Sequence, residues 1–448
     1  MSLLNLNSLL GIVVIIGICW AISSHRTKVN WRLVGMGLGL QFLLALVLFQ
    51  SQSWTMGGQY ENGILFAAVD AFFQAINDYV QEGSQFVFQA NGIPEETPTD
   101  QLVLIRTFAF GVLPTVIFFA ALMSVLYYLG IMQILIRAMA WVMQRTLGTS
   151  GPESLAAAAN VLVGHTEAPL VIRPYVPTMT RSELNALMVG GFSTISGSLM
   201  AIFVIQGISA GHLLTASIIS APAALVIAKI LQPETETPGK LETVDETPEQ
   251  EATNVIEAAA IGASDGVKLA INITAMLIAF LALLAMLNAM VIGLGELVQW
   301  GLNLFRSIPL DIQWSLNGLF AVLFFPLAWI MGIETGDCTI AGELLGKKMV
   351  VNEFVAYLDM SAVQIRSEDY VVQAVDPPSI SQRTQTILTY ALCGFSNFGA
   401  IGIQIGGIGP LAPSRRSDLA QLGLRAMFGG MLAACMTACL AGFLFGIF

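Results

Sequence analysis

The chain has 448 residues, of which 55% are hydrophobic and 11% are charged, with a mean hydropathy of +0.74 and a formal net charge of −11. A soluble globular domain carries about 25% charged residues, so a soluble fold this apolar would leave much hydrophobic surface in water. The composition therefore indicates a membrane protein, and the negative charge argues against nucleic acid as a partner.

A membrane-spanning helix needs about 20 mainly apolar residues. The candidate runs are Leu9–Ile22, Leu33–Phe49, Ala109–Ile131, Leu184–Ile208, Leu213–Leu231, Ile271–Leu294, Leu316–Met331, Thr386–Ile408 and Leu419–Phe448. Basic residues from His25 to Arg32 follow the first run, where a secretory signal would have a cleavage site of small residues. The positive-inside bias places this end of the first helix in the cytoplasm.

Two further segments differ from the spanning runs. In Ile64–Phe88, apolar residues recur at helical spacing against polar ones, which predicts an amphipathic helix lying along the membrane interface. Pro233–Glu251 is rich in Glu, Thr and Pro. It is therefore expected to be the flexible, acidic part of a linker over 232–258.

Two stretches interrupt the helical pattern, Ser150–Pro177 and Gly332–Asp359. Each places a carboxylate, Glu167 or Glu353, between apolar arms too short to span a membrane. This pattern is typical of a re-entrant hairpin. The tip of such a hairpin is tolerated at membrane depth only where it is buried in protein or lines an aqueous cavity.

The two halves of the chain echo each other. After the hairpin with Glu167 comes GGFSTISGSL at 190–199, and after the hairpin with Glu353 comes CGFSNFGAIG at 393–402. Each half thus reads as a hairpin followed by a helix interrupted at Gly-Phe-Ser. Paired repeats with broken helices are typical of secondary transporters, which bind substrate near the midplane between the repeats.

We therefore expect an all-α membrane protein with about eight transmembrane helices, two re-entrant hairpins in an inverted repeat, and interfacial helices. The expected parts are N-terminal scaffold helices with an interfacial helix over 1–131, a first transport repeat over 132–231, the acidic linker over 232–258, a scaffold helix and connecting segment over 259–310, and a second transport repeat over 311–448.

A charge near the bilayer centre costs at least about 2.5–3.5 kcal/mol, so Glu167 and Glu353 need a function or a partner. Carboxylates and amides accept from and donate to the hydroxyls of a ribose well, and Asn397 in the second interrupted helix is a suitable amide. The alternative is a structural ion pair. Arg137 or Arg173 could serve Glu167, and Lys347 or Lys348 could serve Glu353.

Asn160 precedes the first hairpin tip, and Thr194 lies in the first interruption. Side-chain oxygens together with loosened backbone carbonyls form a cage suited to Na⁺, by the oxygen-ligand logic of other hard cations. The five cysteines form no CxxC pair, and the sequence has no HExxH motif. An intramembrane enzyme is therefore disfavoured, and the two matching hairpins disfavour a passive channel.

Three longer segments resemble the concentrative nucleoside transporter family, at residues 164–198, 352–359 and 383–419. The resemblance extends along nearly the whole chain. It implies a homotrimer in a plasma membrane, for a bacterial member the inner membrane, with separate scaffold and transport parts and an elevator-like movement. It also implies a nucleoside substrate, sodium as the coupling ion and no organic cofactor; proton coupling remains the alternative.

The resemblance also assigns site residues. It places the nucleobase-facing group at His165, Thr166 and Glu167, with Leu199 as a hydrophobic neighbour of the base. It places the ribose-binding pair at Glu353 and Asn397, and the sodium site at Asn160, Thr194 and the backbone of Val163 and Ile195.

This chain departs from the family pattern at two of these places. His165 replaces the usual Gln, which is expected to alter base preference or make uptake depend on pH, because histidine titrates near neutral pH. Ala400 replaces the usual Ser, which removes one hydrogen-bond partner of the sugar, worth about 0.5–1.5 kcal/mol. Gly164 is expected to leave room for a larger base, which favours purines.

Overall fold

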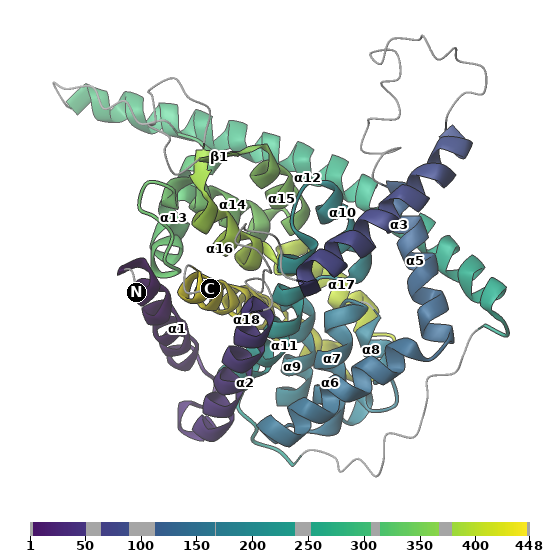
Figure 1. Cartoon of the computed structure of the whole chain (residues 1–448). Coiled ribbons are helices and arrows are strands. Elements are labelled where there is room, and N and C mark those ends of the chain that lie inside the picture. The colour runs from purple at the N-terminus through teal and green to yellow at the C-terminus, as the bar shows by residue number, and fades with distance from the viewer. Residues whose placement is uncertain are drawn as a thin grey trace, which may run out of the picture.

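The computed structural model describes residues 3–50, 64–88, 113–165, 167–237, 252–305, 314–366 and 379–445, and these are almost entirely helical (Figure 1). Among them, six helices or joined helix pairs are long and apolar enough to cross a membrane, or up to seven if one sharply bent pair is counted. Two shorter apolar helices, α13 (Leu316–Ile330) and α17 (Phe398–Ile408), add to these. The helix count agrees roughly with the expected one.

The N-terminal helices cover the predicted runs, although the first one begins six residues earlier than expected. The first two are α1 (Leu3–Ala21) and α2 (Trp31–Gln50), joined by the short 3₁₀ turn η1 (Arg26–Lys28). The predicted amphipathic helix is α3 (Ile64–Phe88). Its apolar residues Phe73, Ile76 and Val80 are buried, as the helical spacing requires.

Helix α5 (Leu113–Tyr128) is followed by α6 (Ile131–Leu147) after a bend of 76°. Gly130 makes the bend, because its φ of 79° lies in the left-handed region that glycine adopts without strain. The predicted run Ala109–Ile131 ends at this bend, and its residues 109–112 lie outside the described residues. Helix α6 was missed because Arg137 and Arg145 lower its hydropathy below that of a spanning run.

The two halves repeat the same order of elements. In the first half, α6 precedes a hairpin of α7 (Gly151–Leu162) and α8 (Ala168–Val171), then the broken helix α9 (Arg181–Ser193) and α10 (Gly197–Ile205), then α11 (Ala210–Leu231). A 3₁₀ turn, η3 (Val176–Thr178), lies between the first hairpin and α9. In the second half, α13 precedes a hairpin of α14 (Cys338–Val350) and α15 (Glu353–Ala362), then α16 (Gln382–Leu392) and α17, then η4 (Pro413–Arg415) and α18 (Arg416–Leu444). We call these the first and second hairpins.

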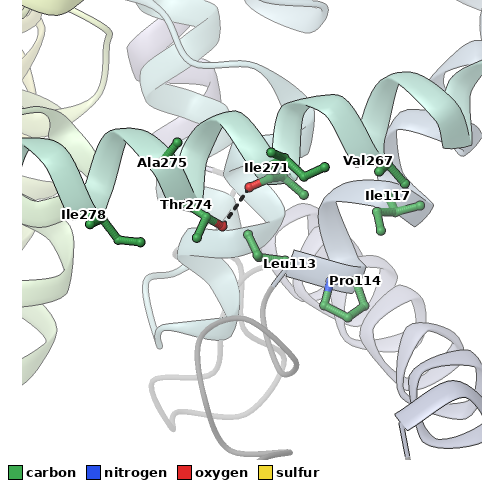
Figure 2. Close-up of a pocket in the computed structure, with 9 residues that line it drawn as sticks. Leu113, Pro114, Ile117, Val267, Ile271, Thr274, Ala275 and Ile278 are labelled. Atoms are coloured by element: carbon green, nitrogen blue, oxygen red, sulfur yellow. Dashed lines mark hydrogen bonds between the residues drawn. The ribbon is translucent and has the colours of Figure 1, made fainter.

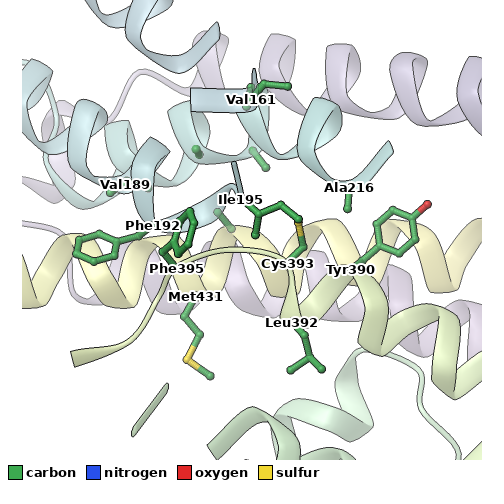
Figure 3. Packing of buried hydrophobic residues seen from close by; sticks show 14 of the residues in the cluster. Val161, Val189, Phe192, Ile195, Ala216, Tyr390, Leu392, Cys393, Phe395 and Met431 are labelled. Carbon is green, nitrogen blue, oxygen red and sulfur yellow. The ribbon is translucent and has the colours of Figure 1, made fainter. Parts of the chain in front are cut away.

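Both predicted interruptions are confirmed. The first break, residues 194–196, separates α9 from α10, and the second break, residues 393–397, separates α16 from α17. The breaks cross each other closely. A Cβ on Gly394 would lie 2.7 Å from the backbone oxygen of Phe192, so only glycine allows the two backbones to touch there. Figure 3 shows Phe192 and Ile195 of the first half beside Cys393 and Phe395 of the second.

Helix α12 (Val255–Phe305) has 51 residues and extends well beyond the predicted run Ile271–Leu294 at both ends. It runs along one side of the molecule, and α5 packs against it (Figure 1). The helices approach closely at Gly262 and Gly266, where a Cβ would lie 2.6 Å from backbone atoms of α5. Two glycines four residues apart are a common packing motif between membrane helices. Of the linker before α12, residues 238–251 lie outside the described residues.

A short parallel pair of strands, β1 (Gln364–Arg366) and β2 (Ser379–Ser381), was not predicted. It lies next to the start of α16. There the backbone N–H of Ser381 donates to the carboxylate of Asp337 at 2.9 Å, and the guanidinium of Arg383 donates to the backbone oxygen of Gly332 at 2.9 Å. Both contacts fix the base of the second hairpin to the start of the second broken helix.

Candidate functional site

The tip of the first hairpin packs directly on the first break. Gly164 has a φ of 92°, and a Cβ on it would lie 2.7 Å from the Cβ of Ser196. A Cβ on Gly197 would lie 3.4 Å from the backbone oxygen of Leu162, at the end of α7. The expectation that Gly164 leaves room for a larger base is therefore wrong, since Ser196 fills that space.

The predicted ribose pair meets in space. The side-chain amide of Asn397 donates to the carboxylate of Glu353 at 3.1 Å, and both residues are buried. The oxygen of the same amide accepts a hydrogen bond of 2.8 Å from the backbone N–H of Ala400 and so caps α17. Because this cap fixes the orientation of the amide, its NH₂ group points at the carboxylate.

Glu353 is the first residue of α15, and Asn352 before it caps that helix through Val355 at 2.9 Å. The N-terminus of a helix carries a partial positive charge and favours a carboxylate in its first turn. Two half-helices, α15 and α17, thus begin beside Glu353. Of the two lysines considered as structural partners, Lys347 instead pairs with Asp359 at 2.6 Å.

The predicted sodium ligands Asn160 and Thr194 both contact Gly190 of α9. The hydroxyl of Thr194 donates to the backbone oxygen of Gly190 at 3.0 Å, and a Cβ on Gly190 would lie 3.0 Å from the amide nitrogen of Asn160. Both side chains are at most 1% exposed. The hydroxyl proton of Thr194 is engaged, so its lone pairs remain available to a cation.

The amide of Asn160 has no hydrogen-bond partner on either atom among the residues that the structure describes. Buried polar atoms are nearly always paired, and an unpaired one costs about 1–3 kcal/mol. A carbonyl-type oxygen left unpaired at the end of α7 fits a cation ligand. Val163 and Ile195, whose backbones were predicted to contribute, are buried at the same hairpin tip and first break.

His165 is buried, and neither ring nitrogen has a hydrogen-bond partner among the described residues. Its ring stands edge-on to that of Phe395 in the second break, with 4.2 Å between ring centroids. Leu199, at the start of α10, is 9% exposed. His165 therefore offers a donor and an acceptor beside an aromatic ring, a combination suited to a planar base.

Two further residues were predicted to face the base, Glu167 and Thr166. Glu167 precedes α8 and is exposed in the single chain. Thr166 lies outside the described residues. The structure thus brings both His165 and Glu353 to the second break, through Phe395 and Asn397.

The sequence reasoning missed Ser396 and Gln404. Both are buried, and the Ser396 hydroxyl and the Gln404 side-chain oxygen have no partner among the described residues. Gln404 donates to the backbone oxygen of Met188 at 3.2 Å. A Cβ on Gly191 would lie 2.7 Å both from the side-chain nitrogen of Gln404 and from the Cβ of His165. The adjacent glycines 190 and 191 were the sequence feature that could have indicated this site, because polar side chains of both halves pack against them.

A separate hollow of about 420 Å³ lies between α5 and α12 (Figure 2). Its walls are almost entirely apolar, and the hydroxyl of Thr274 already donates to the backbone oxygen of Ala270 at 2.9 Å. A nucleoside needs partners for its ribose hydroxyls and base edge. This hollow therefore does not suit such a solute, whereas the buried polar groups at the two breaks do.

Family models match most of the chain. The model described as Na⁺ dependent nucleoside transporter N-terminus matches residues 10–91, and the one described as Na⁺ dependent nucleoside transporter C-terminus matches 212–442. Between them, a gate model described as nucleoside recognition matches 109–210.

Several relatives are similar over almost all of this chain. An uncharacterized transporter of Haemophilus influenzae is 41% identical, over 99% of this chain and 98% of its own length. Solute carrier family 28 member 3 of Rattus norvegicus is 40% identical, over 97% of this chain and 58% of its own length. Sodium/nucleoside cotransporter 1 of Homo sapiens is 39% identical, over 98% of this chain and 64% of its own length. The chain thus spans about three fifths of these two mammalian relatives.

Solved structures of a transporter named CNTnw have the same fold. Its inward-facing substrate-bound state superposes with a TM-score of 0.84 at 37% identity, over 99% of each chain. An outward-facing state of a CNTnw double variant superposes with a TM-score of 0.84 at 36% identity, over 100% of this chain and 99% of that one.

Proposed function

Because this chain belongs to the Na⁺-dependent nucleoside transporter family, we propose that it imports nucleosides by symport with Na⁺. Members of this family are transporters, which move solutes across a membrane. The chain is accordingly a multi-pass protein of the inner membrane. The observation that carries the proposal is the buried contact between Glu353 and Asn397, where two half-helices begin.

The sugar is bound at this contact. The carboxylate of Glu353 accepts from ribose hydroxyls, and the amide of Asn397 has a second N–H with which to donate to them. One carboxylate oxygen already accepts from Asn397, which holds the group in place before the substrate arrives. The base lies toward His165 and Phe395, whose rings meet edge to face.

Na⁺ is the second solute carried, and its ligands are Asn160, Thr194 and the backbone of Val163 and Ile195. The unpaired amide of Asn160 and the engaged hydroxyl proton of Thr194 support this assignment. Proton coupling is the second candidate, favoured by the titratable groups His165 and Glu353 in the same buried region.

Transport proceeds by an elevator-like movement in a homotrimer, with the repeats over 132–231 and 311–448 moving against a scaffold formed over 1–131 and 259–310. Two features support this division. Each hairpin packs on or is bonded to its own broken helix, which favours their movement as one body. The long α12 pairs with α5 at Gly262 and Gly266, and most of its apolar surface is exposed in the single chain.

Uptake of labelled uridine and adenosine into proteoliposomes tests the proposal. An inward Na⁺ gradient and then an inward H⁺ gradient are applied at matched membrane potential. Concentrative uptake under Na⁺ alone is the expected result. Uptake under H⁺ alone would keep nucleoside transport and overturn the sodium site, and no concentrative uptake of either nucleoside under either gradient would overturn the proposed function.

A further inference from the structure

Two consecutive lysines on the first arm of the second hairpin have opposite surroundings. Lys347 reaches outward to the carboxylate of Asp359, whose side chain is 39% exposed. Lys348 is 0% exposed, and its ammonium donates to the backbone oxygen of Ala391 at 2.7 Å. A fully buried lysine is rare unless its charge is compensated. The burial of Lys348 therefore requires a compensating group, whereas Lys347 already pairs with Asp359.

The carbonyl that Lys348 binds belongs to the last turn of α16, just before the second break. The final carbonyls of a helix have no partner within the helix, and their end of the helix carries a partial negative charge. The second hairpin supplies partners from both arms. Lys348 of α14 binds Ala391, and the hydroxyl of Tyr357 on α15 donates to the backbone oxygen of Thr389 at 2.6 Å. The hairpin is thereby fixed to the helix that leads into the ribose site.

Lys348 lies in the last turn of α14 and Glu353 begins α15 five residues later, so a buried cation and a buried carboxylate stand on either side of the second hairpin tip. Among the described residues, the other titratable groups that act on Lys348 are the thiols of Cys393 and Cys435, whose ordinary pKa lies above neutral pH. Glu353 is thus the acidic partner of this buried cation. A buried carboxylate without a compensating charge is strongly destabilising.

The arrangement has a consequence for binding. The ammonium of Lys348 donates its hydrogen bond to the backbone oxygen of Ala391 and not to the carboxylate of Glu353. The carboxylate thereby has a positive charge across the hairpin tip without a direct ion pair, and it accepts from the amide of Asn397 at 3.1 Å. A direct ion pair would occupy an acceptor that the sugar needs.

We propose that Lys348 is the positioning residue for sugar recognition, because its ammonium supplies the counter-charge of Glu353 and holds the second hairpin against α16. This inference rests on the proposed ribose role of Glu353. Lys348 does not touch the substrate, so its effect is exerted through the carboxylate.

The first test compares Lys348→Met with Lys347→Met, which removes the adjacent charge at the Asp359 pair. Uptake of uridine and of 3′-deoxyuridine is measured in proteoliposomes with equal amounts of protein. We expect Lys348→Met to raise KM for uridine about tenfold, which corresponds to about 1.4 kcal/mol, and to raise KM for 3′-deoxyuridine less. Equal effects on both substrates, or an equal effect of Lys347→Met, would overturn the proposal.

The second test needs no transport. Thermal unfolding in detergent is compared for Lys348→Met, Glu353→Gln and the double variant. A counter-charge predicts strong coupling between the two sites, so Glu353→Gln should recover stability that Lys348→Met loses. Additive losses would overturn the proposal even if Lys348→Met is too unstable to transport. If the wild-type protein carries no nucleoside, the proposed function fails, and this cycle still decides whether Lys348 compensates Glu353.

Discussion

The amide of Asn397 donates a hydrogen bond of 3.1 Å to Glu353, although the two residues lie 44 positions apart and on different half-helices. Each stands at a helix start, since Glu353 begins α15 and Asn397 caps α17. Converging helix N-termini favour anions and oxygen acceptors. The pair is thus held in a region that stabilises the carboxylate before a substrate binds.

Removing either member of this pair is expected to reduce uptake severely at low uridine concentration and to leave the protein in the membrane. A hydrogen bond to a charged group contributes roughly 1.5–3 kcal/mol, on the order of 10- to 100-fold in apparent affinity. Glu353→Gln and Asn397→Ala are measured by uridine uptake, with Asp359→Asn on the same helix as the control. Normal uptake by both site variants would refute the ribose assignment.

The hydroxyl of Thr194 is expected to determine the dependence of uptake on Na⁺. Ser193 and Thr194 both donate to the backbone oxygen of Gly190 at 3.0 Å, so Ser193→Ala is a matched control for loss of that bond. Thr194→Val should raise the Na⁺ concentration for half-maximal uptake about tenfold or more, as expected for a lost hard-oxygen ligand. Thr194→Ser should stay near wild type. Identical Na⁺ curves for Thr194→Val and Ser193→Ala would contradict the sodium site.

Gly164→Ala is expected to destabilise the protein and block uptake. Its positive φ costs an L-residue about 1–2 kcal/mol, and overpacking against Ser196 adds about 1–3 kcal/mol. Gly207 has a similar φ of 90°, with nothing within 4 Å of its Cβ position. Gly207→Ala therefore reports the backbone strain alone. Unfolding in detergent should show a clearly larger loss for Gly164→Ala, and equal losses would mean that the contact with Ser196 is unimportant.

His165 is expected to read the base through its ring nitrogens. His165→Phe keeps an aromatic ring beside Phe395 and removes both hydrogen-bonding atoms. Each hydrogen bond lost costs about 0.5–1.5 kcal/mol, so KM should rise roughly 2- to 10-fold for each bond. His165→Gln restores hydrogen bonding and should retain uptake. Competition by uridine, adenosine and their analogues measures the preference. An unchanged KM in His165→Phe would make His165 a packing residue.

Ala400→Ser is expected to strengthen binding of the sugar. Ala400 is 1% exposed and follows Asn397 by one helical turn. The added hydroxyl offers the sugar another partner, worth about 0.5–1.5 kcal/mol. KM for uridine should therefore fall, and the preference for uridine over 3′-deoxyuridine should rise. A higher KM for both substrates would indicate overpacking of this buried position.

Much of the fold was predictable because its signals are local. The arms of the hairpins and the interruptions at Gly-Phe-Ser follow from short apolar runs and from glycine within a helix. Helix α6 and the strands β1 and β2 were not predictable in this way. Arg137 and Arg145 lower the hydropathy of α6 below that of a spanning helix. The strands β1 and β2 have three residues each, which is too short for a periodic pattern.

The site shows the same division. Glu353, Asn397, Asn160 and Thr194 were recognisable from the sequence as polar residues near hairpin tips and helix breaks, because charged and polar groups within apolar runs are costly in a membrane. The contacts among them are visible in the folded chain alone, although the family resemblance had already grouped Glu353 with Asn397. Glu353 accepts from Asn397, and Lys348 is buried whereas Lys347 is not. Both facts depend on how the second hairpin packs on α16. Local sequence patterns do not reveal contacts between segments that lie far apart in the chain.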